Sequence, residues 1–287
     1  MKHAYLIIYH NEYEIAQQLI KAIDDKRNDI YIHVDKKLSE LPSFKVNNAN
    51  IYFINTRIDV KWGDFTVVEA ELELYKEVVK KNDYSYLHLL SGVDMPIKSQ
   101  DYIHEFFESN NGREFIGYSQ YDYTWEVERK VGRVHLFPRD FRPNGTFSFL
   151  VKKTLRYLYI RLQNLLNIQR NSSIDFKKGT QWVSITPEFA RFLVSRSKDI
   201  RSIYKHTFCA DEIYKQTICW NSDFKKSIYN TIDEGLGCMR MIGWKEGRLI
   251  DWEQKDFTSL VNSNYLFARK FNSKHMQVVL DILKHIS

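Results

Sequence analysis

The first hundred residues alternate between short apolar runs, typical of buried strands, and amphipathic runs with helical spacing. We predict helices that begin at Asn11, at Asp64 or Thr66, and at Ser99, because these side chains can cap a helix. Alternation of this kind favours an α/β fold with a doubly wound, mainly parallel sheet flanked by helices, whose ligands bind at the carboxyl ends of the strands. The predicted strands cover residues 5–9, 29–34, 51–54, 84–90 and 115–118.

The remainder of the chain is less regular. Residues 147–205 contain 12 Lys and Arg against three acidic residues. A strand is predicted at 179–185, a helix begins at Thr186, and a final helix covers about 275–286. No linker rich in Pro, Gly or Ser divides the chain, so we expect a single domain over residues 1–287.

Charge and composition narrow the class of function. Lys and Arg outnumber Asp and Glu by 42 to 36, and a net charge of +6 suits a phosphate-bearing partner. The sequence has no RNA-binding signature, so we expect no nucleic acid partner. We also expect no membrane span and no signal peptide, because the apolar runs are too short. Three cysteines without a CxxC spacing indicate neither a disulfide framework nor a zinc site, and we expect a reducing cytoplasm.

Residues 147–170 combine five cations with Leu, Phe and Tyr and contain no acidic residue. One interpretation is a basic amphipathic helix that brings the protein to an anionic membrane surface. The other is an ordinary helix whose leucine side packs against the sheet. The sequence leaves both interpretations open.

Two polar segments directly follow predicted strands. Asp35 comes after the strand at 29–34, where an open sheet places a carboxylate that can accept hydrogen bonds from a nucleotide. Asp94 lies in the segment 91–96, in which Gly92 lets a ligand approach the backbone. Taken alone, each segment is also explained by an ordinary turn at the end of a strand.

A third acidic segment, Asp211 and Glu212, precedes an amphipathic helix. One interpretation makes one of these carboxylates a general base, because taking a proton from a hydroxyl is carboxylate chemistry. The other treats both as acids that interact favourably with the helix dipole.

Cations among apolar residues mark the C-terminal third, at Arg240, Arg248, Arg269 and Lys270. Partly buried cations need an anionic partner, which a diphosphate or an internal carboxylate such as Asp251 supplies. The chain contains no Asp-x-Asp, GxGxxG, GxxxxGK[ST], GxSxG or HExxH motif. A phosphate-bearing ligand would therefore be neutralised by Arg and Lys, and we expect no metal and no other cofactor.

Seven short motifs, taken in order, resemble glycosyltransferase family 14, which contains the core-2/I-branching β-1,6-N-acetylglucosaminyltransferases and the peptide O-xylosyltransferases. Together they run through almost the whole chain, and the basic middle segment resembles the family least. The motifs are YLIIYH at 5–10, HVD at 33–35, WG at 62–63, LSGVDMPIK at 90–98, GTQW at 179–182, ADE at 210–212 and LFARKF at 266–271.

The resemblance implies a GT-A type fold and an inverting transfer from a UDP-sugar without a divalent metal. It implies a nucleotide-binding half at 1–120 and an acceptor and diphosphate-binding half at 121–287. On the matched positions, Glu212 is the catalytic base. The implied contacts are Ile8, Asp35, Thr56 and Arg57 with the uridine, Arg248, Arg269 and Lys270 with the diphosphate, and Asp94, Trp182, Arg240 and Trp244 with the substrate.

The expected function is transfer of a GlcNAc, Xyl, Glc or Gal type sugar from UDP to a hydroxyl of a glycan acceptor. The animal relatives have a membrane anchor and many disulfides, whereas this sequence resembles a bacterial cytoplasmic member that builds capsular or exopolysaccharide. Its acceptor would then be lipid-linked, at the inner face of the cell membrane. Two other functions stay open: a non-catalytic carbohydrate-binding protein of the same fold, and a membrane-surface adaptor that acts through residues 147–170.

Overall fold

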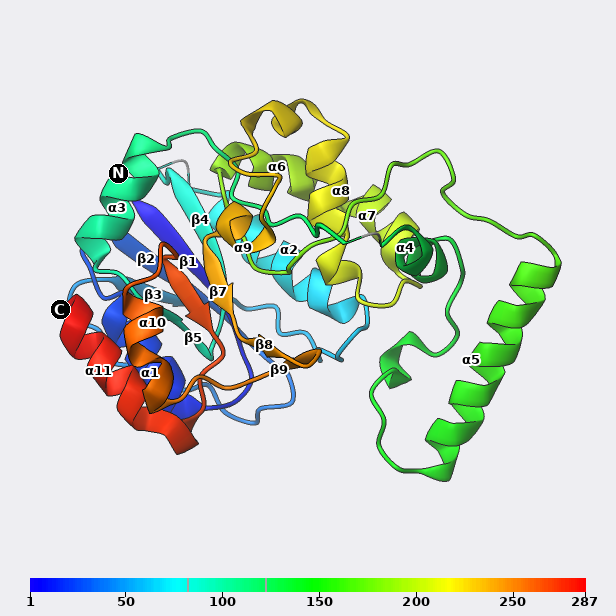
Figure 1. The fold of residues 1–287 in the computed structure, drawn as a ribbon, viewed down its shortest axis with the longest axis horizontal. Helices are drawn as coiled ribbons and strands as arrows, with labels where there is room; N and C mark the ends of the chain where they lie inside the picture. Colours follow the sequence, from blue (N-terminus) through cyan, green and yellow to red (C-terminus); the bar gives the residue numbers. More distant parts are fainter. Residues whose placement is uncertain (82, 122) are drawn as a thin grey trace.

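The computed structural model describes residues 1–81, 83–121 and 123–287 (Figure 1). A five-stranded sheet with the order β3-β2-β1-β4-β6 forms its centre. Neighbouring strands from β3 to β4 are parallel, and only the pair of β4 and β6 is antiparallel. The predicted α/β fold with a mainly parallel sheet is therefore confirmed. The strands are β1 (His3–Tyr9), β2 (Asn28–Val34), β3 (Asn50–Phe53), β4 (Tyr86–Ser91) and β6 (Ser184–Ile185).

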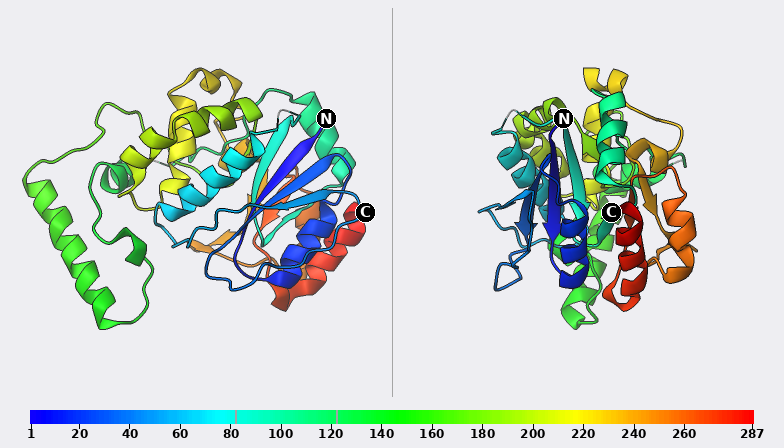
Figure 2. Two further views of the ribbon diagram at one scale, coloured as in Figure 1. Left: turned by 180° about the vertical axis from the view of Figure 1, so that it is seen from behind. Right: turned by 90° about the vertical axis from the view of Figure 1, so that its left-hand side faces the viewer.

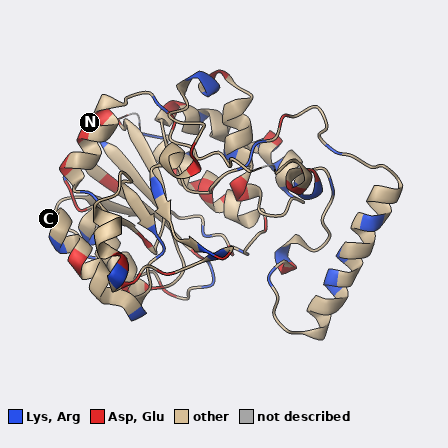
Figure 3. Ribbon diagram, viewed as in Figure 1, with Lys and Arg blue, Asp and Glu red and all other residues tan. Residues whose placement is uncertain are grey.

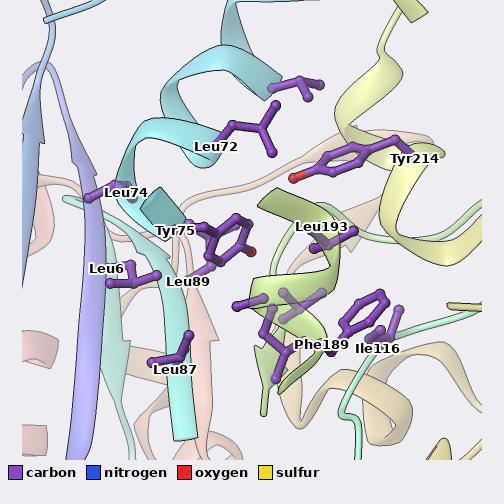
Figure 4. Packing of buried hydrophobic residues seen from close by; sticks show 14 of the residues in the cluster. Leu6, Leu72, Leu74, Tyr75, Leu87, Leu89, Ile116, Phe189, Leu193 and Tyr214 are labelled. Carbon is purple, nitrogen blue, oxygen red and sulfur yellow. The ribbon is translucent and has the colours of Figure 1, made fainter. Parts of the chain in front are cut away.

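Helices cover both faces of this sheet, because successive side chains of each strand point to opposite faces. In β1, Leu6 packs into one core with α2, α6 and α8 (Figure 4), whereas Tyr5 and Ile7 pack into the other with α1, α3 and α11. Figure 2 shows α1 and α11 side by side on that second face. The bounds are α2 (Thr66–Val78), α6 (Pro187–Ser195), α7 (Ser197–Tyr204) and α8 (Tyr214–Trp220) on the first face, and α1 (Tyr13–Ala22), α3 (Gln100–Ser109), α10 (Phe257–Val261) and α11 (Met276–Ile286) on the second.

A smaller sheet with the order β5-β10-β7 joins distant parts of the chain. Strand β10 runs antiparallel to β5 and parallel to β7, so the segments near residues 95 and 268 become neighbours. A short hairpin, β8–β9, follows β7. The bounds are β5 (Asp94–Pro96), β7 (Arg240–Ile242), β8 (Trp244–Lys245), β9 (Arg248–Leu249) and β10 (Phe267–Arg269), with α9 (Glu234–Cys238) and the 3₁₀ turns η2 (Ala210–Glu212), η3 (Asp223–Ser227), η4 (Gln254–Asp256) and η5 (Ser273–His275) between or after them.

Two of the predicted helix caps are confirmed and two are wrong. The hydroxyl of Ser99 accepts a backbone N–H of α3 at 3.3 Å, and that of Thr186 accepts one of α6 at 3.2 Å. Helix α2 begins at Thr66, but neither Asp64 nor Thr66 is its cap residue. Asn11 does not cap α1. The cap residue there is Glu12, in the left-handed conformation and without a side-chain hydrogen bond to the helix.

The predicted strands at 115–118 and 179–185 are wrong in extent. The first contributes only an isolated bridge, and the second is a strand only over β6. Their backbones meet so closely that a Cβ atom on Gly179 would lie 1.9 Å from the carbonyl oxygen of Gly117. The Gln216 amide donates to a backbone carbonyl of each segment, so a side chain replaces the strand ladder here.

The segment at residues 124–165 extends away from the sheet. It contains α4 (Thr124–Val131), η1 (Pro138–Asp140) and α5 (Phe147–Leu165). Figures 1 and 2 show α5 away from both helical layers. Only Phe149 and Gln163 are buried in this helix, and its leucines are exposed. The interpretation in which the leucine side packs against the sheet is therefore wrong.

Candidate active site

The carboxyl ends of β1, β2 and β4 meet at one edge of the main sheet. Ile8 lies between His33 and Ser91 in the strand register. The backbone N–H of Asp35 donates to the Tyr9 carbonyl at 2.9 Å, which continues the pairing beyond β2. Two residues predicted to contact uridine, Ile8 and Asp35, are therefore brought together at this edge.

The Asp35 carboxylate is buried and already has a cationic partner. Its Oδ2 lies 2.9 Å from the Lys37 ammonium, and its Oδ1 accepts the Lys37 backbone N–H at 2.9 Å. A carboxylate offers about four lone-pair positions, so acceptor capacity is left for a ligand.

Thr56 and Arg57 lie in the loop that crosses this edge after β3. The Arg57 guanidinium donates to the carbonyls of Val34 at 3.2 Å and Asp35 at 2.9 Å, and also to that of Leu38. Thr56 beside it is exposed. The structure thus places both residues next to Asp35, with Arg57 holding the loop in place through backbone carbonyls.

Asp94, Trp182 and Arg269 come together from three distant parts of the chain. The β5–β10 register sets Arg269 opposite Asp94, and its Nε lies 3.3 Å from the Asp94 Oδ1. Asp94 also accepts the hydroxyl of Ser91 at 2.7 Å. The guanidinium carbon of Arg269 lies 4.2 Å from the centre of the Trp182 ring. Three of the residues predicted to bind the donor or the substrate therefore form one cluster.

Ser91 connects this cluster to the strand-end edge, because it is the register partner of Ile8 and its hydroxyl donates to Asp94. The charges of both regions also act on His10. Partial burial lowers its pKa, and the charges of Asp35 and Arg269 both act on it, the first raising the pKa and the second lowering it. Arg142, from the loop that precedes α5, acts in the same direction as Arg269. The edge around Asp35 and the cluster around Arg269 are therefore parts of one site.

Glu212 ends the turn η2 and reaches solvent, with 37% of its side chain exposed. Its Oε2 lies 3.6 Å from the ammonium of Lys130 and 4.0 Å from that of Lys178. Both lysines also contact Glu126, at 2.6 Å and 3.0 Å. Burial alone would lower the pKa of Lys130, but Glu212 and Glu126 outweigh it and raise the pKa, so this lysine stays charged at neutral pH.

Asp211, the neighbour of Glu212, points into the protein instead. Its Oδ1 has no hydrogen-bond partner among the described residues. Burial raises its pKa to about 7, and the nearby carboxylates of Glu212 and Glu71 act in the same direction. Of the two acids in the segment, Glu212 is thus the one placed to meet a ligand.

A fully buried ion pair lies beneath Asp211. The carboxylate of Glu71, on α2, accepts hydrogen bonds from the ammonium of Lys215, from the hydroxyl of Tyr214 and, at 2.8 Å, from the amide of Gln181. Lys215 also donates to the Asp211 carbonyl at 3.2 Å. This pair ties α2, the segment before β6 and α8 to the turn that carries Glu212.

The cations predicted for the diphosphate lie around the base of the β8–β9 hairpin. The ammonium of Lys270 is 3.5 Å from the Asp251 carboxylate and is 37% exposed. The Gly243 N–H donates to the Arg269 carbonyl at 3.1 Å, which ties the start of the hairpin to these residues. Arg248 is exposed on the hairpin itself, as is Trp244.

Arg240, which the resemblance predicts to contact the substrate, lies in the core instead of at the surface of this site. It is only 2% exposed. Its guanidinium donates to the Val183 carbonyl at 2.7 Å and the Ser184 hydroxyl at 3.0 Å, and it stacks over Phe267. Burial lowers its pKa to about 10. Backbone carbonyls and the Ser184 hydroxyl therefore bind this cation in the core, and its Nε has no hydrogen-bond partner among the described residues.

Two cavities lie near the candidate site, one against α4 and one against the β8–β9 hairpin. The first, of about 430 Å³, is bounded by Tyr123, by Glu128 of α4 and by residues 169–172 and 174–177, so it uses other α4 residues than the Glu212 network does. The second, of about 360 Å³, lies against the hairpin and includes Asp251.

Residues 1–81, 83–121 and 123–287 hold no group of three or more His, Cys, Asp and Glu that could bind a metal ion. No helix in that part of the chain is long and apolar enough to cross a membrane. The three cysteines are free and buried.

A family model named Core-2/I-Branching enzyme matches residues 3–276. A human protein called probable beta-1,3-galactosyl-O-glycosyl-glycoprotein beta-1,6-N-acetylglucosaminyltransferase 7 is 26% identical over 220 residues, covering 71% of this chain and 47% of that protein. Xylosyltransferase 2 of Rattus norvegicus is 22% identical over 307 residues, covering 98% and 33%. The chain thus spans less than half the length of these relatives. Mouse xyloside xylosyltransferase 1, in its apo form, aligns over 96% of this chain with a TM-score of 0.38 and 10% identity.

Proposed function

The chain belongs to the Core-2/I-Branching enzyme family, and on that premise we propose that it is an inverting glycosyltransferase that uses a UDP-sugar without a divalent metal. The single observation that carries the proposal is the position of Glu212. Its carboxylate reaches solvent between two ammonium groups, in a part of the chain that the family model covers.

In the proposed reaction, the Glu212 carboxylate takes the proton of an acceptor hydroxyl as that oxygen attacks the anomeric carbon of the donor. The new glycosidic C–O bond forms while the bond to the diphosphate breaks on the opposite side, which inverts the configuration. UDP leaves as an anion, so it needs electrostatic stabilisation but no proton.

Positive side chains supply that stabilisation. Lys270 is half-exposed and bound only weakly to Asp251, so a diphosphate can compete for it. Arg248 is exposed on the adjoining hairpin. Arg269 already pairs with Asp94 and stacks on Trp182. We therefore assign it two roles: it forms the wall of the site beside the sugar, and it contacts the diphosphate.

The uridine would lie at the strand-end edge. Ile8 offers an apolar contact and Asp35 a buried acceptor, while Arg57 keeps the loop with Thr56 across this edge. The link through Ser91, which is the register partner of Ile8 and donates to Asp94, supports a nucleotide that extends from this edge to Arg269. The donor sugar, the acceptor and the cellular location stay predictions.

The proposal is tested by titrating the protein with UDP in a calorimeter, with and without EDTA, and by screening UDP-sugars for transfer and hydrolysis. We expect equal UDP affinity in both buffers and turnover of at least one donor. Loss of binding in EDTA would contradict the metal-free site. Binding of UDP without any turnover would instead favour a non-catalytic carbohydrate-binding protein.

A further inference from the structure

Six apolar side chains of α5 form one stripe along the helix. They recur every three or four residues, which places them on a single side of an α-helix. All of them are exposed, and the two end members, Phe147 and Leu165, are 81% and 80% exposed. We call these residues the α5 outward stripe: Phe147, Val151, Leu155, Leu158, Leu162 and Leu165.

The opposite side of α5 holds the helix to the protein by polar contacts. The Gln163 amide donates to the Val134 carbonyl and accepts the Val134 N–H, each at 2.9 Å. Arg156 donates to the Leu136 carbonyl at 2.8 Å, and Lys152 lies 3.0 Å from an oxygen of Asp140. These bonds set the rotation of the helix, so the outward stripe faces away from the protein.

The charged side chains of α5 are all cationic. Figure 3 shows Lys and Arg but no acidic residue along α5. Lys153 and Arg161 are exposed and have no carboxylate partner in the part of the chain that the structure describes. Tyr157, which accepts a hydrogen bond from Arg161 at 2.8 Å, is also exposed. All three side chains lie on one flank of the stripe, with Arg161 and Tyr157 beside it and Lys153 farther round the helix. An apolar stripe with cations and tyrosine on its flank is the pattern of a helix that lies in a membrane interface.

We propose that the α5 outward stripe lies in the interface of an anionic lipid bilayer, with Lys153 and Arg161 at the level of the lipid headgroups. An anionic surface complements these unpaired cations. A second copy of the chain, pairing stripe against stripe, would bring cations close to cations instead. The proposal needs no sugar donor, so it stands or falls separately from the proposed reaction.

The experiment measures sedimentation of the protein with vesicles of phosphatidylcholine alone or mixed with phosphatidylglycerol, at low and at high salt. The stripe variant is L158Q/L162Q, and the cation variant is K153Q/R161Q. Lys152 and Arg156 are left unchanged because they hold the helix in place. The matched control is Ile232→Gln, which changes an exposed apolar residue outside α5.

We expect the native protein and the control to bind mixed vesicles at low salt and to bind less as salt screens the charges. The stripe variant should bind about tenfold more weakly or worse, since it loses buried apolar area. The cation variant should bind roughly tenfold more weakly, with little remaining salt dependence. Native protein that stays in the supernatant at low salt would overturn the proposal. So would a dimer, detected by light scattering, that the stripe variant dissociates while vesicle binding is unchanged.

Discussion

The two acidic regions of the site pair a carboxylate with lysines at very different distances along the chain. At the strand-end edge, Asp35 is neutralised by Lys37, two residues along the chain. Below Glu212, the buried Glu71 is neutralised by Lys215, 144 residues away. The first arrangement is a local turn, whereas the second exists only when α2 and α8 are both in place. Changes at the edge should therefore affect ligand binding alone, and changes below Glu212 should affect stability and turnover.

The largest effect is expected from Glu71→Gln. The change leaves the Lys215 ammonium buried without a counter-charge, so the free energy of unfolding should fall by about 3–5 kcal/mol. Denaturant unfolding followed by circular dichroism measures it. The matched control is Glu69→Gln on the same helix, whose pair with the largely exposed Arg201 should contribute less than about 1 kcal/mol.

A double change separates the charge from the packing at this position. Glu71→Gln combined with Lys215→Met removes both charges, and it should recover part of the lost stability because no unpaired ion is left in the core. A double variant that is less stable than Glu71→Gln would contradict the explanation that the unpaired Lys215 ammonium causes the loss of stability.

The next effect concerns turnover. Glu212→Gln keeps the shape of the side chain but cannot accept a proton, so kcat should fall by about 10²-fold or more. Binding of UDP, measured by calorimetry, should stay within a factor of about two because the change lies outside the diphosphate contacts. Glu188→Gln, at an exposed position on α6, serves as the control. Turnover near the native value would remove Glu212 from the role of base.

A smaller effect distinguishes the two ends of the nucleotide. Lys270→Ala removes a cation from the diphosphate end and should weaken UDP binding roughly tenfold while leaving uridine binding nearly unchanged. Asp35→Asn should weaken uridine and UDP by similar factors, because it acts at the end that both ligands share. Parallel titrations of the two ligands give the comparison. Equal losses of uridine and UDP in Lys270→Ala would indicate damage to the fold instead.

The sequence predicted the local features of the site and missed those that depend on tertiary distance. Asp35 directly follows a run of strand-forming residues, so its place at the sheet edge could be predicted. Lys130 belongs to a segment without a motif, Lys178 lies just before the GTQW motif, and only the fold brings both to Glu212. Glu71 did leave a signal, since it is an acid within the apolar side of a predicted helix.

Arg240 shows why one sequence pattern can have two causes. A cation among apolar residues predicts an anionic partner, yet a guanidinium has five donors and backbone carbonyls can satisfy them equally well. Arg240 donates to backbone carbonyls, whereas Arg269, which also lies among apolar residues in the sequence, pairs with Asp94. The exposed stripe of α5 had two interpretations for a similar reason: periodicity identifies the apolar side of a helix but not what lies against it.

The smallest effect is a pH dependence from the buried neighbour of Glu212. Burial raises the pKa of Asp211 to about 7, from an ordinary value of 3.8. A carboxyl with a raised pKa holds its proton more tightly in the folded state, so the free energy of unfolding falls as the pH rises from about 4 to 7. Asp211→Asn removes this titration, so between mildly acidic and neutral pH its Tm should fall less, or rise more, than that of the native protein. Burial lowers the pKa of His33, His104 and His135 to about 4, which adds a slope of the opposite sign in both proteins. Some slope should persist, because burial also raises the pKa of Glu114 to about 7. The control is Asp223→Asn at an exposed position, which should leave the slope as it is. If Asp211→Asn leaves the slope unchanged too, Asp211 is ionised in the folded protein throughout this range. The buried carboxylates of Asp211 and Glu71 are then both charged, and cations other than Lys215 must help to balance them.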